Sequence, residues 1–340
     1  QTIIVCGDSG SGKTETTKHL AEFLCSNNQI FKQFSGVGPL IEAFGNATTQ
    51  NNLNSSRFVK LFQYLLDSSN ELDYAIEFNN LDNGLSEIGL LDDRKMHLYK
   101  VLALILHLGN IEFESERESE GCSIATHSLS SLTAASEIMN IDIMDMKRFL
   151  LKRSFVVNTV NTKSSTEIPL TVSAASKARN TISKELYSTL FRFVMSKTND
   201  TIPSEISRNN INVLDIPGFE CFDNNYFEQL TINYTNEKLQ QFWSARLIED
   251  EVQVYQDECL DIGSVPFFDN KAVLDLLEMR SRGLFSLLDD ESRSPRPSHN
   301  NFILKIENNW AKHEALQLCT EGFIIRHFAG NVHYNTVSRL

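Results

Sequence analysis

One glycine-rich segment near the start of the chain has residue types spaced for binding phosphate. Residues 7–14 read GDSGSGKT and fit the pattern G-x-x-x-x-G-K-[ST]. An apolar run at 2–6 precedes the segment and a helix-forming stretch at 15–24 follows it, which predicts a strand, a tight loop and a helix. Glycines let successive N–H groups point inward at a helix N-terminus, where they attract an anion. We therefore predict a phosphate loop formed by Gly7, Asp8, Ser9, Gly10, Ser11, Gly12, Lys13 and Thr14.

Two residues of the phosphate loop have the chemistry to hold a nucleoside triphosphate and its metal. The Lys13 ammonium is a point charge that can reach the β- and γ-phosphates. The Thr14 hydroxyl can bind Mg²⁺, which prefers oxygen ligands and keeps several waters. The sequence therefore predicts a bound nucleotide with Mg²⁺ at this loop.

Contacts to the γ-phosphate must come from other segments. Residues 52–58, NLNSSRF, form a polar cluster whose hydroxyls and amides could line the phosphates. Residues 215–220, DIPGFE, follow a strand-like run at 212–214, as expected for an acidic residue near the metal. Gly218 has no Cβ, so its N–H can approach the γ-phosphate closely.

In order, these three segments resemble the P-loop, switch I and switch II of the myosin head family. Three further blocks extend the resemblance over nearly the whole chain: PLIEAFGNA (39–47), ILHLGNIEFE (105–114) and FEQLTINYTNEKLQQF (227–242). Three others resemble class VI myosins: GCSIATHS (121–128), LLDDESRSPRPS (287–298) and EGFIIRHFAG (321–330). We call residues 51–60 switch I and residues 215–220 switch II.

The resemblance implies a binding role for four of the site residues. Lys13 and Thr14 hold the phosphates and Mg²⁺, and Ser56 is the second protein ligand of the metal. Asn52 binds the phosphate oxygens.

Catalytic roles are implied in the same way for residues of the two switches. Ser55 helps to relay the proton of the attacking water, and Asp215 lies just beyond the direct ligands of Mg²⁺. Gly218 offers its N–H to the γ-phosphate. Arg57 and Glu220 form a salt bridge that closes the site behind that phosphate, which excludes water and strengthens the interactions inside.

The resemblance also implies a fold and a function. It implies an α/β P-loop NTPase fold of the myosin-head type, in which helices flank a mixed, mostly parallel sheet. The implied activity is Mg²⁺-dependent, actin-activated ATP hydrolysis that drives movement on actin filaments in the cytoplasm, at the cytoskeleton. Actin filaments are the implied partners, together with light chains or calmodulin bound to a neck that this chain lacks.

Departures from the family pattern leave a second hypothesis open. Val59 stands where the family has glycine, and Pro217 lacks a backbone N–H. The resemblance makes residues 1–340 a partial motor domain that lacks an N-terminal region, a segment after Phe62 and everything after Leu340. A truncated or degenerate head that binds nucleotide without productive turnover is therefore the alternative. A kinesin-like ATPase is disfavoured, because kinesins typically have NxxSSRSH and DLAGSE in the two switches.

Residue patterns outside the motifs predict the elements that must position them. Helical patterns cover 92–107, 131–152 and 173–199, the segment 111–130 is expected to be exposed, and 323–334 is expected to form a hairpin. Residues 219–262 contain no glycine or proline, and their apolar residues recur at helical spacing. They predict a relay-type helix over about 224–260, longer than the usual range of about 8–20 residues.

Composition excludes several classes of function. The net charge of −13 argues against a nucleic-acid partner, because phosphate backbones attract stripes of Lys and Arg. The absence of an apolar run of about 18 residues predicts a protein that does not span a membrane. Six cysteines without a CxxC pair predict reduced thiols in a cytosolic protein, and the eight histidines show no zinc-ligand spacing with them. No coiled coil is seen.

Overall fold

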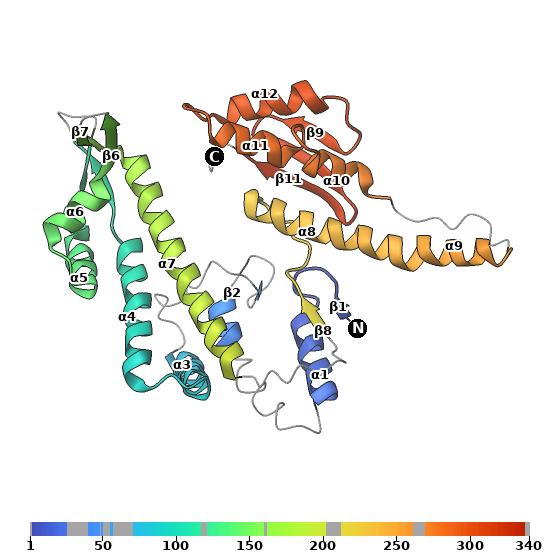
Figure 1. Cartoon of the computed structure of the whole chain (residues 1–340), viewed down its shortest axis with the longest axis horizontal. Coiled ribbons are helices and arrows are strands. Elements are labelled where there is room, and N and C mark those ends of the chain that lie inside the picture. The colour runs from blue at the N-terminus through green and yellow to red at the C-terminus, as the bar shows by residue number, and fades with distance from the viewer. Residues whose placement is uncertain are drawn as a thin grey trace. The chain divides into compact units, whose positions relative to one another are not determined.

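Contacts within the chain divide it into two compact units (Figure 1). The computed structural model describes residues 2–25, 40–47, 49, 55–56, 71–116, 121–159, 162–201, 212–260 and 269–336. The first unit consists of residues 1–18, 49–55 and 211–340, and the second of residues 19–48 and 56–210.

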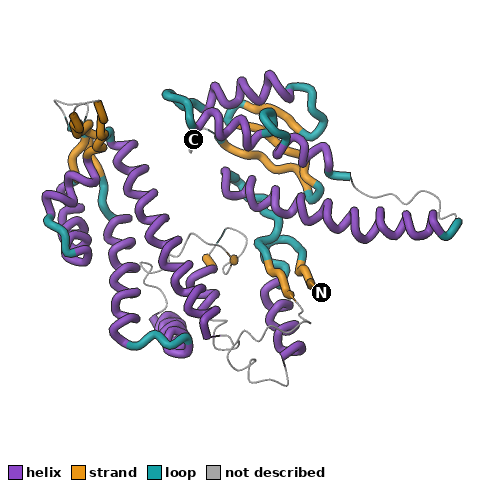
Figure 2. The backbone as a smooth tube through the Cα atoms, viewed as in Figure 1, coloured by secondary structure: helices purple, strands orange, loops and turns teal. Residues whose placement is uncertain are grey.

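A pair of parallel strands brings distant parts of the first unit together. β1 (Thr2–Val5) pairs with β8 (Asn212–Asp215), with Thr2 opposite Asn212 and Val5 opposite Asp215. The two strands lie side by side in Figure 2. Because parallel strands end at the same edge, the phosphate loop after β1 and switch II after β8 leave the pair together. This pair is parallel, whereas the other described sheets with strands of three or more residues are antiparallel, so the mostly parallel sheet stays an expectation.

Helices follow each of these two loops. α1 (Lys13–Cys25) begins within the phosphate loop. After switch II, α8 (Phe227–Ser244), a π-helical turn η2 (Ala245–Glu249) and α9 (Asp250–Asp257) form one helical run. A single α-helix was expected over about 224–260. The structure instead has the π turn near the middle of the run, and no glycine or proline signals it in the sequence.

The rest of the first unit is a small antiparallel sheet covered by helices. The strands β9 (Leu316–Cys319), β10 (Gly322–His327) and β11 (Gly330–Asn335) lie in the order β11–β10–β9, and the expected hairpin over 323–334 is formed by β10 and β11. The helices are α10 (Lys271–Glu278), α11 (Leu284–Ser292) and α12 (His299–Trp310). Their buried faces share a core with the sheet that includes Leu276, Ile306, Phe323, Ile325 and Val332.

The second unit is mainly helical. Its longer helices are α3 (Glu71–Glu87), α4 (Asp92–Gly109) and α7 (Val172–Thr201). Of these, α4 and α7 occupy two of the three ranges with helical patterns, whereas α3 was not predicted. The third range, 131–152, is divided into α5 (Leu129–Met139) and α6 (Ile143–Leu151), because Asn140 takes a left-handed φ of 53°. The hairpin β6 (Lys152–Thr159) and β7 (Thr162–Pro169) is antiparallel.

One expectation for the second unit is partly wrong. Residues 111–130 were expected to be exposed, but they contain the antiparallel strands β4 (Phe113–Ser115) and β5 (Cys122–Ile124) and the short helix η1 (Thr126–Ser128). Ile111, Phe113 and Cys122 are buried in a core with α4, α5, α6 and α7. The expectation holds for the described charged residues of the segment and for Leu129, which are exposed, but fails for the apolar residues in this core.

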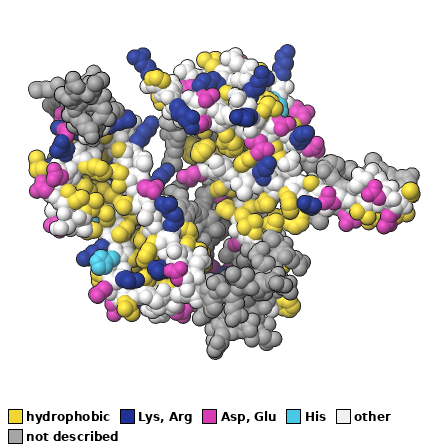
Figure 3. Space-filling model, viewed as in Figure 1, with side chains coloured by type: hydrophobic (Ala, Val, Ile, Leu, Met, Phe, Trp, Pro, Cys, Tyr) yellow, Lys and Arg dark blue, Asp and Glu magenta, His cyan; other side chains and the backbone are white. Residues whose placement is uncertain are grey.

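Two very short strands complete the described elements: β2 (Asn46–Ala47) and β3 (Ser55–Ser56). No helix in the described ranges is long and apolar enough to cross a membrane. In Figure 3, acidic and basic side chains are interspersed over the visible face, without a large basic patch.

Candidate functional site

The backbone of residues 7–14 turns tightly through glycines in a left-handed conformation. Gly10 and Gly12 have φ angles of 83° and 86°, a left-handed conformation that a side chain at Cβ disfavours. Within the loop the Ser11 N–H donates to the Asp8 carbonyl (3.2 Å), and the Thr16 N–H donates to the Gly12 carbonyl (2.9 Å) in the first turn of α1. The first N–H groups of a helix have no acceptor within the helix, so a helix start of this kind suits an anion.

Lys13 lies inside this loop. Its side chain is buried, with 9% of the residue exposed, and its Nζ donates to the carbonyl oxygens of Gly7 (2.9 Å) and Asp8 (2.5 Å). Burial lowers the pKa of Lys13, while the nearby Asp215 carboxylate acts in the opposite direction. The hydrogen-bond partners of this ammonium are neutral carbonyls, so a phosphate would be a stronger partner for it.

A side-chain hydrogen bond joins the phosphate loop to switch II. The Thr14 hydroxyl donates to Oδ2 of Asp215 at 2.9 Å, although 201 residues separate them in sequence. The parallel β1–β8 pair explains the contact, because it places the two loops at one edge. Two adjacent oxygen donors of this kind suit a hard cation such as Mg²⁺. Within the described residues, no three His, Cys, Asp or Glu side chains gather as metal ligands.

Gly218 brings the switch II backbone directly against the phosphate loop. A Cβ added to Gly218 would lie 2.4 Å from both the Gly7 carbonyl oxygen and the Lys13 Nζ, so only glycine fits. Next to it, the Ser9 N–H donates to the Phe219 carbonyl (3.3 Å). A side chain at position 218 would therefore separate the two loops.

Glu220 is buried rather than solvated. The residue is 1% exposed, and its carboxylate accepts a hydrogen bond from Gln229 Nε2 (3.3 Å). Its backbone N–H donates to Asn233 Oδ1 (2.8 Å), and its carbonyl accepts from Asn233 Nδ2 (2.7 Å). The salt-bridge partner expected for it, Arg57, lies outside the described residues.

Switch I is described only in part. Ser55 and Ser56 form β3, and Ser55 is 4% exposed. The described contacts of the phosphate loop do not include Ser55. Asn52 and Val59 lie outside the described residues, as does the segment after Phe62.

The sequence analysis missed the amides that hold switch II from α8. Besides Asn233 and Gln229, Asn236 donates through Nδ2 to the Pro217 carbonyl (3.1 Å). Residues 229, 233 and 236 recur at helical spacing, so one face of α8 is buried and polar. This spacing of amide side chains, shortly after the DIPGFE motif, is the sequence signal that could have indicated their contact with switch II.

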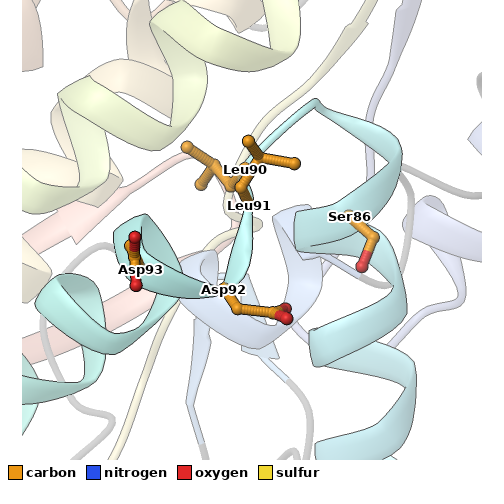
Figure 4. A pocket seen from close by; sticks show the side chains of 5 residues that line it. All are labelled: Ser86, Leu90, Leu91, Asp92 and Asp93. Atoms are coloured by element: carbon orange, nitrogen blue, oxygen red, sulfur yellow. The ribbon is translucent and has the colours of Figure 1, made fainter.

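A separate shallow pocket, of about 410 Å³, lies in the second unit where α3 joins α4 (Figure 4). It is lined by Ser86, Leu90, Leu91, Asp92 and Asp93. No basic side chain lines it, and two carboxylates would repel a phosphate. We therefore place the candidate site at the phosphate loop and switch II.

Comparisons with known proteins identify relatives of the chain. The model of the family described as myosin head (motor domain) matches residues 1–75 and 66–340. Myosin heavy chain 95F of Drosophila melanogaster is 32% identical over 446 residues, covering 99% of this chain and 36% of that protein. Human unconventional myosin-VI is 32% identical over 446 residues (99% and 34%). Myosin-I heavy chain of Dictyostelium discoideum is 29% identical over 410 residues (99% and 17%).

Proposed function

Because the chain belongs to the myosin head (motor domain) family, we propose that it binds ATP with Mg²⁺ and forms part of an actin-based motor. The observation that carries this proposal is the Thr14–Asp215 hydrogen bond, which joins the phosphate loop to switch II at the end of two parallel strands. The chain spans about a third of the length of the first curated relatives it matches. Actin-activated hydrolysis, cytoskeletal location and binding of light chains through a neck are therefore proposed for the whole protein.

The described residues suggest how the phosphates are held. Lys13 exchanges its two carbonyl partners for the β- and γ-phosphates, and the loop N–H groups bind the remaining oxygens. Thr14 supplies one oxygen ligand for the metal, and Asp215 fixes that hydroxyl through their hydrogen bond. When bound, Mg²⁺ neutralises charge on the transferring phosphate. Ser56 is proposed as the second protein ligand.

The roles of the switches in hydrolysis belong to the same proposal. Gly218 lies close enough to Lys13 for its N–H to meet a γ-phosphate bound there. Ser55 relays the proton of the attacking water, and Asn52 binds phosphate oxygens. Arg57 pairs with the buried Glu220 and excludes bulk water from the closed site.

Switch II is also the point at which hydrolysis is coupled to movement. Asn233 and Asn236 attach α8 to the backbone of Glu220 and Pro217. A shift of switch II on loss of the γ-phosphate therefore acts on the N-terminal half of a long helical run. Packed helices transmit such shifts as discrete steps. This gives the run 227–257 the role of a relay.

Nucleotide binding is tested with Lys13→Ala in the full chain. We expect an affinity loss of roughly 10- to 100-fold for a fluorescent ATP analogue, because a charge-assisted contact is worth about 1.5–3 kcal/mol. Lys18→Ala is the matched control. Lys18 lies on the same helix and pairs with Glu15 at its exposed surface. Equal affinity of the Lys13→Ala variant and the wild-type protein would contradict the phosphate-loop assignment.

The alternative function is a head fragment that binds nucleotide without turnover. The 446-residue alignments exceed the 340 residues of the chain, so the relatives contain residues that have no counterpart here. Steady-state phosphate release with and without filamentous actin separates the two functions. Actin-stimulated release supports the motor, whereas nucleotide binding without release supports the alternative.

A further inference from the structure

A chain of buried hydrogen bonds leads from switch II to Glu237, one turn along α8 from Asn233 and on the same helix face. Its members are Glu220, Asn233, Tyr334, His327 and Glu237. Asn233 and Glu237 lie on α8, His327 ends β10, and Tyr334 lies in β11. The side-chain members Asn233, Tyr334, His327 and Glu237 are between 0 and 5% exposed. Bulk solvent does not reach these side chains, and buried donors are almost always paired with an acceptor.

The backbone of switch II fixes the orientation of the first member. The Glu220 N–H can only donate, so the Asn233 atom at 2.8 Å from it is the amide oxygen. The Asn233 NH₂ group then donates one hydrogen to the Glu220 carbonyl (2.7 Å) and the other to the Tyr334 hydroxyl oxygen (2.9 Å). Tyr334 thus accepts from Asn233, and its own O–H points elsewhere.

The acceptor for that O–H is the His327 ring. Nε2 of His327 lies 2.8 Å from the Tyr334 oxygen, and Nδ1 lies 2.9 Å from Glu237 Oε1. If Nε2 carried a proton, the imidazole and Asn233 would both donate to Tyr334, and the buried Tyr334 O–H would have no acceptor within the described contacts. With the proton on Nδ1 alone, every donor in the chain has an acceptor.

Glu237 ends the chain as a carboxylate surrounded by N–H donors. Besides His327, the Phe328 N–H donates to Oε1 (3.1 Å), and Asn270 Nδ2 donates to Oε2 (2.5 Å). Asn270 also donates to the Glu237 carbonyl (2.8 Å). The carboxylate is thereby fixed to β10 and to the start of α10.

We propose that His327 is a neutral Nδ1–H imidazole that positions switch II through Tyr334 and Asn233. The donor-to-acceptor direction of the hydrogen bonds requires this single tautomer. The same hydrogen bonds set where the Glu220 backbone lies. If the function proposed above holds, His327 thereby sets the geometry of the loop that meets the γ-phosphate. His327 does not touch the nucleotide site, so it acts only as a positioning residue.

Two substitutions of His327 separate its two hydrogen bonds. The amide of His327→Asn extends to the place of Nδ1, so this variant keeps a hydrogen-bond donor to Glu237 and loses the hydrogen bond to Tyr334. The amide of His327→Gln reaches the place of Nε2, so this variant keeps an acceptor for the Tyr334 hydroxyl and loses the hydrogen bond to Glu237. Tyr334→Phe removes the hydroxyl and leaves the ring. Tyr187→Phe is the matched control, because this tyrosine is 4% exposed and donates to the Phe44 carbonyl (2.6 Å) within the second unit.

The test is amide hydrogen exchange of the nucleotide-free full chain, read in the peptide covering 216–222. We expect exchange roughly five- to ten-fold faster in His327→Asn and Tyr334→Phe, near-wild-type exchange in His327→Gln, and no change in Tyr187→Phe. Imidazole ¹⁵N chemical shifts, assigned with His327→Asn, should show a proton on Nδ1 alone. A doubly protonated ring, or His327→Gln exchanging as fast as His327→Asn, would overturn the proposal. Exchange is measured without nucleotide, so failure of the Lys13 binding test would leave this result unaffected.

Discussion

The two units of the chain bury very different side chains. Five buried lysine, glutamate or histidine residues lie in the first unit: Lys13, Glu220, Glu237, Glu291 and His327. In the described part of the second unit, Lys95 is the one such residue. Its cores are otherwise built from apolar groups such as Leu132 and Leu150. Buried charges cost stability unless they are hydrogen-bonded. The first unit therefore sacrifices stability to fix the geometry of a site, whereas the second unit is built mainly for packing.

The largest expected effect comes from removing the Glu237 carboxylate, which ends the chain of buried hydrogen bonds. Glu237→Ala should lower the free energy of unfolding by about 3–5 kcal/mol, because several buried donors lose their acceptor. Glu185→Ala in the second unit should change it by less than about 0.5 kcal/mol, since the Glu185 side chain is 73% exposed in its pair with Arg192. Urea unfolding of both variants measures the difference. Equal losses would remove the distinction between the units.

A somewhat smaller effect is expected at the contact between the two loops. Gly218→Ala should weaken binding of an ATP analogue by about 100-fold, because the new methyl group would collide with the phosphate loop. Gly109→Ala in the second unit is the control. Its Cβ would meet nothing within 4 Å, so we expect unchanged binding and a gain of about 0.4–1 kcal/mol in stability. Normal affinity in Gly218→Ala would show that the loops separate without consequence.

The lowered pKa of Lys13 predicts how binding depends on pH. Burial favours the neutral amine in the free protein, whereas a bound triphosphate favours the ammonium. Binding then takes up a proton at any pH above the lowered pKa, so affinity should fall as the pH rises through that pKa, by at most about tenfold per pH unit. Lys13→Arg, which stays charged, should bind with a flat profile. A flat profile in the wild-type protein would contradict the assigned burial of this charge.

The smallest effect is expected at an ion pair of the second unit. Hydrogen bonds from Lys95 and Tyr99 lower the pKa of Asp82. A lowered pKa in the folded state contributes stability above about pH 4, and that stability is lost as the pH falls through the folded pKa. Because the Asp82 side chain is 38% exposed, we expect Asp82→Asn to cost only about 1 kcal/mol at neutral pH. Urea unfolding at neutral and acidic pH should show this difference shrinking on acidification.

Local patterns were sufficient to predict the elements around residues 7–14 and much of the helical structure. The pattern at 2–24 predicted a strand, a loop and a helix, found as β1 and α1 with residues 6–12 between them, and the pattern over 92–107 predicted α4. These features depend on neighbours within a few residues, so a single sequence specifies them. The roles of Asn52, Ser56 and Arg57 stay predictions.

Contacts between distant residues could not be predicted from local patterns. The bonds of Asn233 and His327 to Tyr334 depend on how β10 and β11 pack against α8, and no local periodicity encodes this. The burial of Ile111, Phe113 and Cys122 within residues 111–130 was missed for a similar reason. That segment is polar on average, and only the placement of Ile111 and Phe113 against α4 and α7 decides which side chains are buried.

The β1–β8 pair has a consequence for synthesis on the ribosome. The partners are 210 positions apart, as in Thr2 opposite Asn212. At about 5–20 residues per second, β1 leaves the ribosome roughly 10–40 s before its partner has been made. During that interval its edge is open to wrong pairing with other strands. In a nascent chain of this protein the phosphate loop and switch II therefore cannot meet until β8 emerges, and that interval is when a chaperone would matter most.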